Sequence, residues 1–95
     1  MQPESSFDPS GPTSPVAANP ERYQSFGEKA VGLDFNPSGD PTVYTLKSQI
    51  AAAIDTLHEL REGTSNGEVK RMCSVAITEL QAGQMWAVKA ITWKH

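Results

Sequence analysis

The sequence predicts an all-α fold: an antiparallel hairpin of two long helices behind a short N-terminal helix. Apolar residues recur at alternating steps of three and four over residues 40–62, as they do along one face of a helix. Residues 66–93 are apolar around most of a helical circumference, and only a short segment, 64–68, connects the two stretches. Because so short a connection makes consecutive helices run antiparallel, these observations together predict a hairpin.

The first nineteen residues differ in composition from the rest. Residues 1–19 contain four prolines with four serines and one threonine between them, and few large apolar side chains. Such a segment cannot offset its ordering entropy by burial, so we expect a disordered tail at 1–19 before a hairpin domain at 20–95. A Pro-rich ligand for a partner groove is the alternative interpretation of the tail.

A short helix is expected over residues 20–30. Asn19 followed by Pro20 is typical of a helix start, and Gly32 can end the helix. On such a helix Tyr23 and Phe26 would share one face. Because an isolated helix of this length is unstable, it must dock on another part of the protein.

The segment that follows is turn-forming, and it leads into the first long helix. It contains the turn dipeptides Asn36-Pro37 and Ser38-Gly39. Phe35 has two interpretations: a hydrophobic staple at the mouth of the next helix, or a ring that stacks on a ligand base.

Asp40 and Pro41 form a strong helix start, since one caps free N–H groups and the other has none to leave unpaired. The helix is expected over 40–62, with Gly63 as its C-cap. Its apolar seam consists of Val43, Leu46, Ile50, Ala53, Leu57 and Leu60.

The second long helix is expected from about Asn66 to Trp93. Ser65 and Glu68 have the spacing of a capping box. The polar residues form only a narrow band along this helix, so the first helix can cover one side and further copies of the chain must cover the rest. Trp86 and Trp93, seven residues apart, are expected to anchor such an interface. The sequence therefore predicts an oligomeric bundle.

Composition excludes several classes of protein. The net charge is −3 and the isoelectric point is about 5.2, so duplex DNA is not an expected partner. No apolar stretch approaches the roughly 20 residues that span a bilayer, so no membrane association is expected either. The single cysteine, Cys73, lies in an apolar run and is expected to be a buried thiol. Together these features favour a reducing cytoplasm.

No catalytic or metal-binding motif is present, so an enzyme is not predicted and no cofactor or metal is expected. The two histidines are far apart in sequence. His58 is expected to be a solvated surface residue beside Asp55 and Glu62, and His95 ends the sequence. A catalytic site shared between subunits is the remaining alternative.

Three features are candidates for binding an anion. Lys47 lies two turns into the first long helix, and Arg71 opens the second. The turn residues Phe35, Asn36 and Ser38 offer a ring, an amide and a hydroxyl near a helix N-terminus, where free N–H groups favour phosphate. Neither Lys47 nor Arg71 lies on the apolar seam of its helix, so we expect substitution of either to leave the fold intact.

Two stretches carry a family resemblance. Residues 26–39, FGEKAVGLDFNPSG, and residues 71–92, RMCSVAITELQAGQMWAVKAIT, resemble the phage anti-CBASS and anti-Thoeris sponge family. The resemblance covers residues 20–93. It implies a helical hairpin that assembles as a hexamer and holds cyclic oligonucleotide immune signals without cleaving them, which blocks CBASS signalling in the cytoplasm of the host bacterium.

The resemblance also implies roles for individual residues. Lys47 matches a lysine that meets the phosphates of a cyclic dinucleotide, and Phe35 or Tyr23 would stack on a base. Arg71 matches an arginine that contacts cyclic trinucleotides where three chains meet. Two alternatives remain: a sponge for the ADP-ribose-derived signal of Thoeris, and a phage interaction protein that blocks a host protein.

Overall fold

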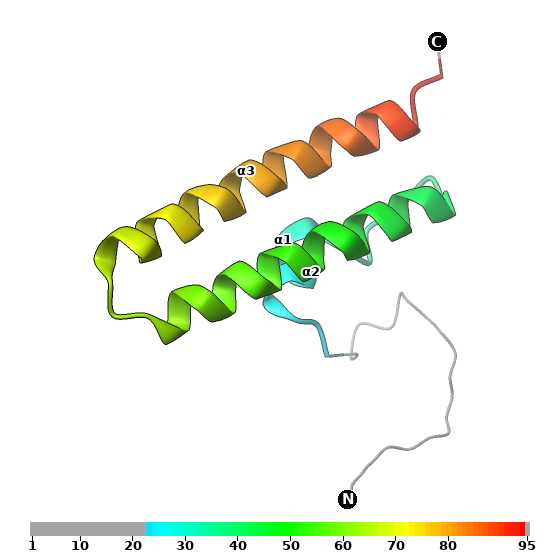
Figure 1. The fold of residues 1–95 in the computed structure, drawn as a ribbon. Coiled ribbons are helices and arrows are strands. Elements are labelled where there is room, and N and C mark those ends of the chain that lie inside the picture. The colour runs from blue at the N-terminus through cyan, green and yellow to red at the C-terminus, as the bar shows by residue number, and fades with distance from the viewer. Residues whose placement is uncertain (1–22, 95) are drawn as a thin grey trace, which may run out of the picture.

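The computed structural model describes residues 23–94, and every regular element in that range is helical. The helices are α1 (Phe26–Val31), α2 (Pro41–Gly63) and α3 (Gly67–Ile91). Figure 1 shows α2 and α3 side by side and antiparallel, with α1 against α2. The prediction of a helical hairpin with a short leading helix is confirmed. The tail predicted for residues 1–19 lies outside the described residues.

Helix α1 is shorter than predicted. Asn19 and Pro20 lie outside the described residues, but Tyr23 and Gln24 are not helical, and the helix begins after Ser25. Ser25 and Glu28 form a capping box that satisfies N–H groups at this point, so the local caps set the start of the helix. Tyr23 therefore does not share a helical face with Phe26.

The end of α1 and the start of α2 agree with the sequence prediction. Gly32 ends α1 at a φ of 62°, and the Asp40 side chain accepts a hydrogen bond from the Thr42 N–H as α2 begins. The predicted C-cap of α2 is wrong by one residue, because Gly63 is still helical and Thr64 is the cap.

Helix α3 begins with a different cap from the one predicted. The Asn66 side chain accepts from the N–H groups of both Glu68 and Val69, so Asn66, rather than Ser65, caps the helix. The helix ends at Ile91, two residues before the predicted end, and Thr92 forms the cap.

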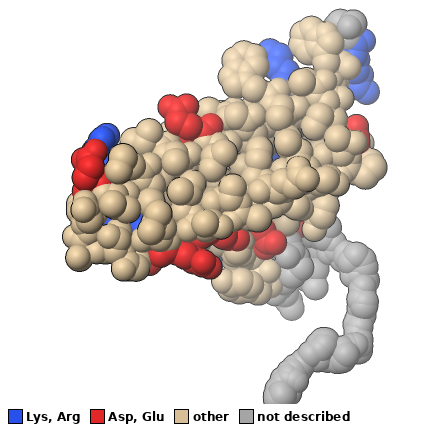
Figure 2. Space-filling model, in the orientation of Figure 1, with Lys and Arg blue, Asp and Glu red and all other residues tan. Residues whose placement is uncertain are grey.

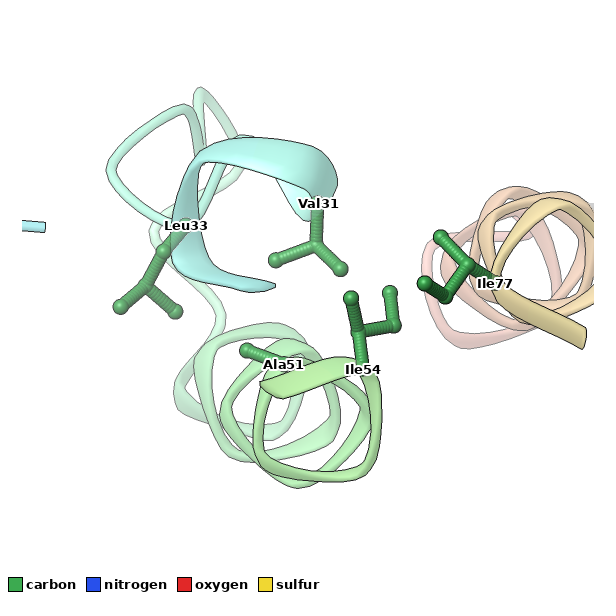
Figure 3. Packing of buried hydrophobic residues seen from close by; sticks show 5 residues of the cluster. All are labelled: Val31, Leu33, Ala51, Ile54 and Ile77. Carbon is green, nitrogen blue, oxygen red and sulfur yellow. The ribbon is translucent and has the colours of Figure 1, made fainter. Parts of the chain in front are cut away.

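The core lies where the three helices meet. Val31, Leu33, Ala51, Ile54 and Ile77 form one buried cluster. Figure 3 shows Val31, Ile54 and Ile77 pointing toward one another from α1, α2 and α3. Cys73 is buried in α3, as predicted.

The apolar seam predicted for α2 is only partly buried. Val43 is buried, but Ala53 and Leu60 are exposed, whereas Ala51 and Ile54 are buried. The reason is that α2 packs against α1 as well as α3, so its buried face is rotated from the one that a simple two-helix seam requires.

Gly27 allows α1 to approach α2 closely. Its N–H donates to Asp55 Oδ1 at 2.6 Å. A Cβ atom built at Gly27 would lie 2.0 Å from the Ala51 carbonyl oxygen, so no larger residue fits without separating the helices.

His58 is not the solvated residue that the sequence predicted. Its ring stacks on Phe26 with centroids 4.1 Å apart, and Arg61 lies against the same Phe26 ring at 5.5 Å. The correction follows from the docking of α1, which brings Phe26 over this face of α2.

Much apolar surface on α3 is uncovered within one chain. The exposed large residues of this helix and its C-terminal end are Met72, Val75, Met85, Trp86 and Trp93. Figure 2 shows a face of the hairpin covered mostly by side chains other than Lys, Arg, Asp and Glu. Within residues 23–94, no helix combines the length and apolar character needed to cross a membrane.

Candidate functional site

The turn between α1 and α2 forms a pocket with the C-terminal half of α3, called here the loop pocket. Its volume is about 520 Å³, within the range of small-molecule binding sites. Its main lining residues are 35–38 of the turn, Val43 and Lys47 of α2, and Gln84, Met85 and Val88 of α3. Four of the predicted site residues, Phe35, Asn36, Ser38 and Lys47, are therefore brought together by the fold.

Lys47 is buried, with 4% of its surface exposed. Its ammonium donates to the carbonyl oxygens of Gly32, at 3.0 Å, and Phe35, at 2.5 Å. Burial lowers the pKa of Lys47 from its ordinary value of 10.5. Since an ammonium has three N–H donors and two are used, one donor is left.

This burial corrects one expectation. Lys47 was expected to lie away from the packed face of α2, so that its substitution would not affect the fold. Instead the turn folds back over α2 and presents its carbonyl oxygens to the lysine. Lys47 therefore holds the turn in place, and removing its ammonium leaves two carbonyl groups without this partner.

Asn36 and Ser38 hold the shape of the turn. The Asn36 amide donates to the Asp40 carbonyl oxygen at 3.1 Å, and the Ser38 hydroxyl donates to Asn36 Oδ1 at 2.8 Å. The Asp40 N–H donates in turn to the Ser38 hydroxyl. Their polar groups are thus engaged within the turn, at the rim of the loop pocket.

The two aromatic candidates are placed differently. Phe35 lines the loop pocket with 72% of its surface exposed, and the Lys47 ammonium lies 5.7 Å from its ring centroid. This exposure does not fit a hydrophobic staple, which would bury the ring. Tyr23 is 83% exposed and is not among the residues that line this pocket. Of the two rings, only Phe35 is brought beside Lys47.

Arg71 lies apart from the loop pocket, near the other end of α3. It borders a shallow hollow of about 280 Å³ with Ser74, Val75, Thr78 and Glu79. Its guanidinium forms two hydrogen bonds to the Glu68 carboxylate, at 3.1 and 2.5 Å. This pair raises the pKa of Arg71 and lowers the pKa of Glu68. Arg71 is exposed, but it already has an anionic partner.

Gln84 was missed by the sequence reasoning. It lines the loop pocket from α3, and only 8% of its surface is exposed. The available signal was an amide side chain on a helix that is otherwise apolar around most of its circumference. Nothing in the sequence distinguishes it from Gln81, whose amide donates to the Ala30 carbonyl oxygen at 3.1 Å.

The arrangement in the loop pocket can bind an anion with an aromatic group attached. It offers a cation, an exposed ring and an apolar wall from α3. In the part of the chain that the structure describes, no group of His, Cys, Asp and Glu side chains is arranged to hold a metal ion.

Comparison with known protein families gives a match to a hairpin-domain family. A family model described as "Acb2/Tad1, hairpin domain" matches residues 28–92, which include all of α2 and α3. The family consists of phage anti-CBASS and anti-Thoeris sponge proteins. Neither the curated proteins nor the solved structures yielded a match.

Proposed function

Because this chain belongs to the Acb2/Tad1 hairpin family, we propose that it binds and sequesters cyclic oligonucleotide second messengers without cleaving them. Cyclic dinucleotides are the proposed ligands of the loop pocket, and cyclic trinucleotides are the proposed ligands of the Arg71 hollow. Sequestration in the cytoplasm of the infected bacterium would block CBASS signalling.

The juxtaposition of Lys47 and Phe35 in the loop pocket is the observation that carries this proposal. The remaining N–H of Lys47 can donate to a phosphate oxygen, and a hydrogen bond to a charged group contributes about 1.5–3 kcal/mol. The exposed Phe35 ring can stack on a base, which contributes about 1–3 kcal/mol. A nucleotide is a ligand that carries both a phosphate and a flat base.

Assembly would complete the site. A cyclic dinucleotide has two phosphates, so two copies of the chain related by a two-fold axis could each supply one Lys47. The exposed apolar residues of α3, among them Trp86 and Met85, support an oligomer because a lone chain would leave them in water. We propose a homohexamer, the assembly that the family resemblance implies.

The proposed role requires no turnover. A sponge lowers the free concentration of a signal when its sites outnumber the signal molecules and its dissociation constant lies below their concentration. It needs no nucleophile or general base. No step of bond cleavage is therefore part of the proposal.

Calorimetry with a panel of cyclic dinucleotides, cyclic trinucleotides and an ADP-ribose-derived cyclic nucleotide tests the function. We expect at least one cyclic dinucleotide to bind and to be recovered chemically intact after the protein is denatured by heat. Binding of the ADP-ribose derivative alone would favour the anti-Thoeris alternative. Binding of none would contradict the sponge function and favour a protein that blocks a host protein.

Two variants test the assignment of the loop pocket. Phe35→Ala removes an exposed ring, so we expect unchanged thermal stability and dinucleotide binding weaker by about fivefold or more. Lys47→Met removes the charge but keeps a long apolar stem, and we expect at least about tenfold weaker binding together with some loss of stability. Lys29→Met, at an exposed position on α1, is the control and should change neither property. Undiminished binding by both pocket variants would contradict the assignment.

A further inference from the structure

Gln84 is a polar side chain of the loop pocket without a hydrogen-bond partner among residues 23–94. It lines, from α3, the same pocket as Lys47 and Phe35, and more than nine-tenths of its surface is buried. Its carboxamide forms no hydrogen bond with any residue that the structure describes, in contrast to the amides of Gln24 and Gln81. Its pocket neighbours on α3, Met85 and Val88, have no polar side-chain group with which it could pair.

A buried amide without partners is costly. Most buried polar side-chain atoms in proteins are hydrogen-bonded, and leaving one unsatisfied destabilises the folded state. A carboxamide could make up to four hydrogen bonds, two as donor and two as acceptor. A methionine would fill a similar volume without this cost. The presence of glutamine therefore points to a polar group that enters the pocket from outside the chain.

Neither of the other two binding groups can distinguish one nucleobase from another. The Lys47 ammonium is a point charge suited to phosphate, and stacking on Phe35 is tolerant of sequence because every base has a flat face. A carboxamide differs, since it presents a donor and an acceptor side by side. That pattern matches the adjacent donor and acceptor on the N6/N7 edge of adenine, whereas guanine presents two acceptors on the corresponding edge.

We propose that Gln84 reads the base of a cyclic dinucleotide held in the loop pocket, by pairing its carboxamide with the edge of an adenine. Nε2 donates to N7, and Oε1 accepts from the N6 amino group. This inference rests on the proposed function, and it adds to it the residue that determines base specificity and the base that it favours. Lys47 then binds the phosphate, Phe35 stacks on the face of the base, and Gln84 of α3 pairs with the edge of the base.

The test is calorimetry with cyclic di-adenylate and cyclic di-guanylate on the wild-type protein and two matched variants. Gln84→Met keeps the length of the side chain and removes its hydrogen bonds. We expect it to weaken cyclic di-adenylate binding at least about tenfold, which corresponds to about 1.4 kcal/mol, and cyclic di-guanylate binding by less than about threefold. Its melting temperature should stay the same or rise, because an unsatisfied buried amide is removed.

Gln81→Met is the control on the same helix. Its amide is already bonded to the Ala30 carbonyl oxygen, and it is not among the residues that line the loop pocket. This variant should have a lower melting temperature and unchanged affinity for both ligands. The two glutamines, three residues apart, are thus expected to give opposite patterns in binding and stability.

Several results would overturn the inference. Unchanged affinity of Gln84→Met for cyclic di-adenylate would remove Gln84 from the site. An equal loss of affinity for both ligands would contradict the recognition of adenine by Gln84. A lower melting temperature together with a smaller particle mass by light scattering would show that a second copy of the chain satisfies the amide instead. If the wild-type protein binds no cyclic dinucleotide at all, the proposed function of the pocket is wrong. If the wild-type protein binds cyclic di-adenylate and Gln84→Met binds it equally well, only the role of Gln84 is wrong.

Discussion

Gly27→Ala should destabilise the protein through the contact between α1 and α2. The added Cβ would lie 2.0 Å from the Ala51 carbonyl oxygen and 2.9 Å from Asp55 Oδ1. The nearest atoms are backbone atoms of α2, so relief requires α1 to move away from α2. That movement weakens the 2.6 Å hydrogen bond from the Gly27 N–H to Asp55 and loosens the packing of Val31 over Ile54.

The size of the effect follows from three contributions. Overpacking a buried contact costs about 1–3 kcal/mol. Loss of a hydrogen bond to a charged group costs about 1.5–3 kcal/mol. The higher helix propensity of alanine offsets about 1 kcal/mol of this. We therefore expect the free energy of unfolding to fall by about 1.5–5 kcal/mol.

Urea denaturation followed by circular dichroism measures this change, and Gly83→Ala provides the control. Gly83 is exposed in the middle of α3, and a Cβ there meets no atom within 4 Å. The same substitution should therefore raise stability by up to about 1 kcal/mol, through helix propensity alone. If Gly27→Ala is as stable as the wild-type protein, the close approach of α1 to α2 is wrong. Repeating both titrations at several protein concentrations separates folding from assembly.

Three further predictions concern charge and assembly. Because burial lowers the pKa of Lys47, the lysine loses its charge at a lower pH than an ordinary lysine, and dinucleotide affinity should begin to fall at a pH below 10.5. Calorimetry over a series of pH values up to 10.5 should show this fall for the wild-type protein and not for Lys47→Met. Glu68→Gln should raise trinucleotide affinity by up to about fivefold, because it releases Arg71 from a weak exposed ion pair. If neither Glu68→Gln nor Arg71→Ala changes trinucleotide affinity, the Arg71 hollow is not the binding site. Trp86→Asp should reduce the particle mass measured by light scattering without loss of helix content, since the ring is exposed in the single chain; an intact oligomer would place Trp86 outside the interface.

Local signals predicted the helices well. Asp40 with Pro41 starts α2 and Gly32 ends α1, because these residues satisfy or terminate the backbone hydrogen bonds of their own helix. The antiparallel arrangement also followed from the sequence, since a connection as short as residues 64–66 permits little else. The N-cap of α3 was predicted as Ser65 and is Asn66, because both residues have a side chain that can cap a helix at this point.

The candidate site was predicted in part. Phe35, Asn36 and Ser38 are neighbours in sequence, and Lys47 was a candidate from its place two turns into the helix, to which the family resemblance added a phosphate-binding role. Four residues of the loop pocket could therefore be named in advance. Their mutual arrangement could not. Lys47 was expected to lie off the packed face, yet it is buried under the turn, because its hydrogen-bond partners at Gly32 and Phe35 lie more than ten residues away.

What the sequence alone determined are the properties carried by neighbouring residues: helical periodicity, caps, turn residues and the excess of apolar surface on α3. The tertiary structure decided which faces pack. Because α1 docks on α2 at Gly27, the buried face of α2 is rotated away from the apolar seam that the sequence predicted. The same docking placed Phe26 on His58, and the hairpin placed Gln84 opposite Lys47. The members of these two pairs lie 32 and 37 positions apart in the sequence, so their placement depends on the packing of whole helices and cannot be read from the local pattern.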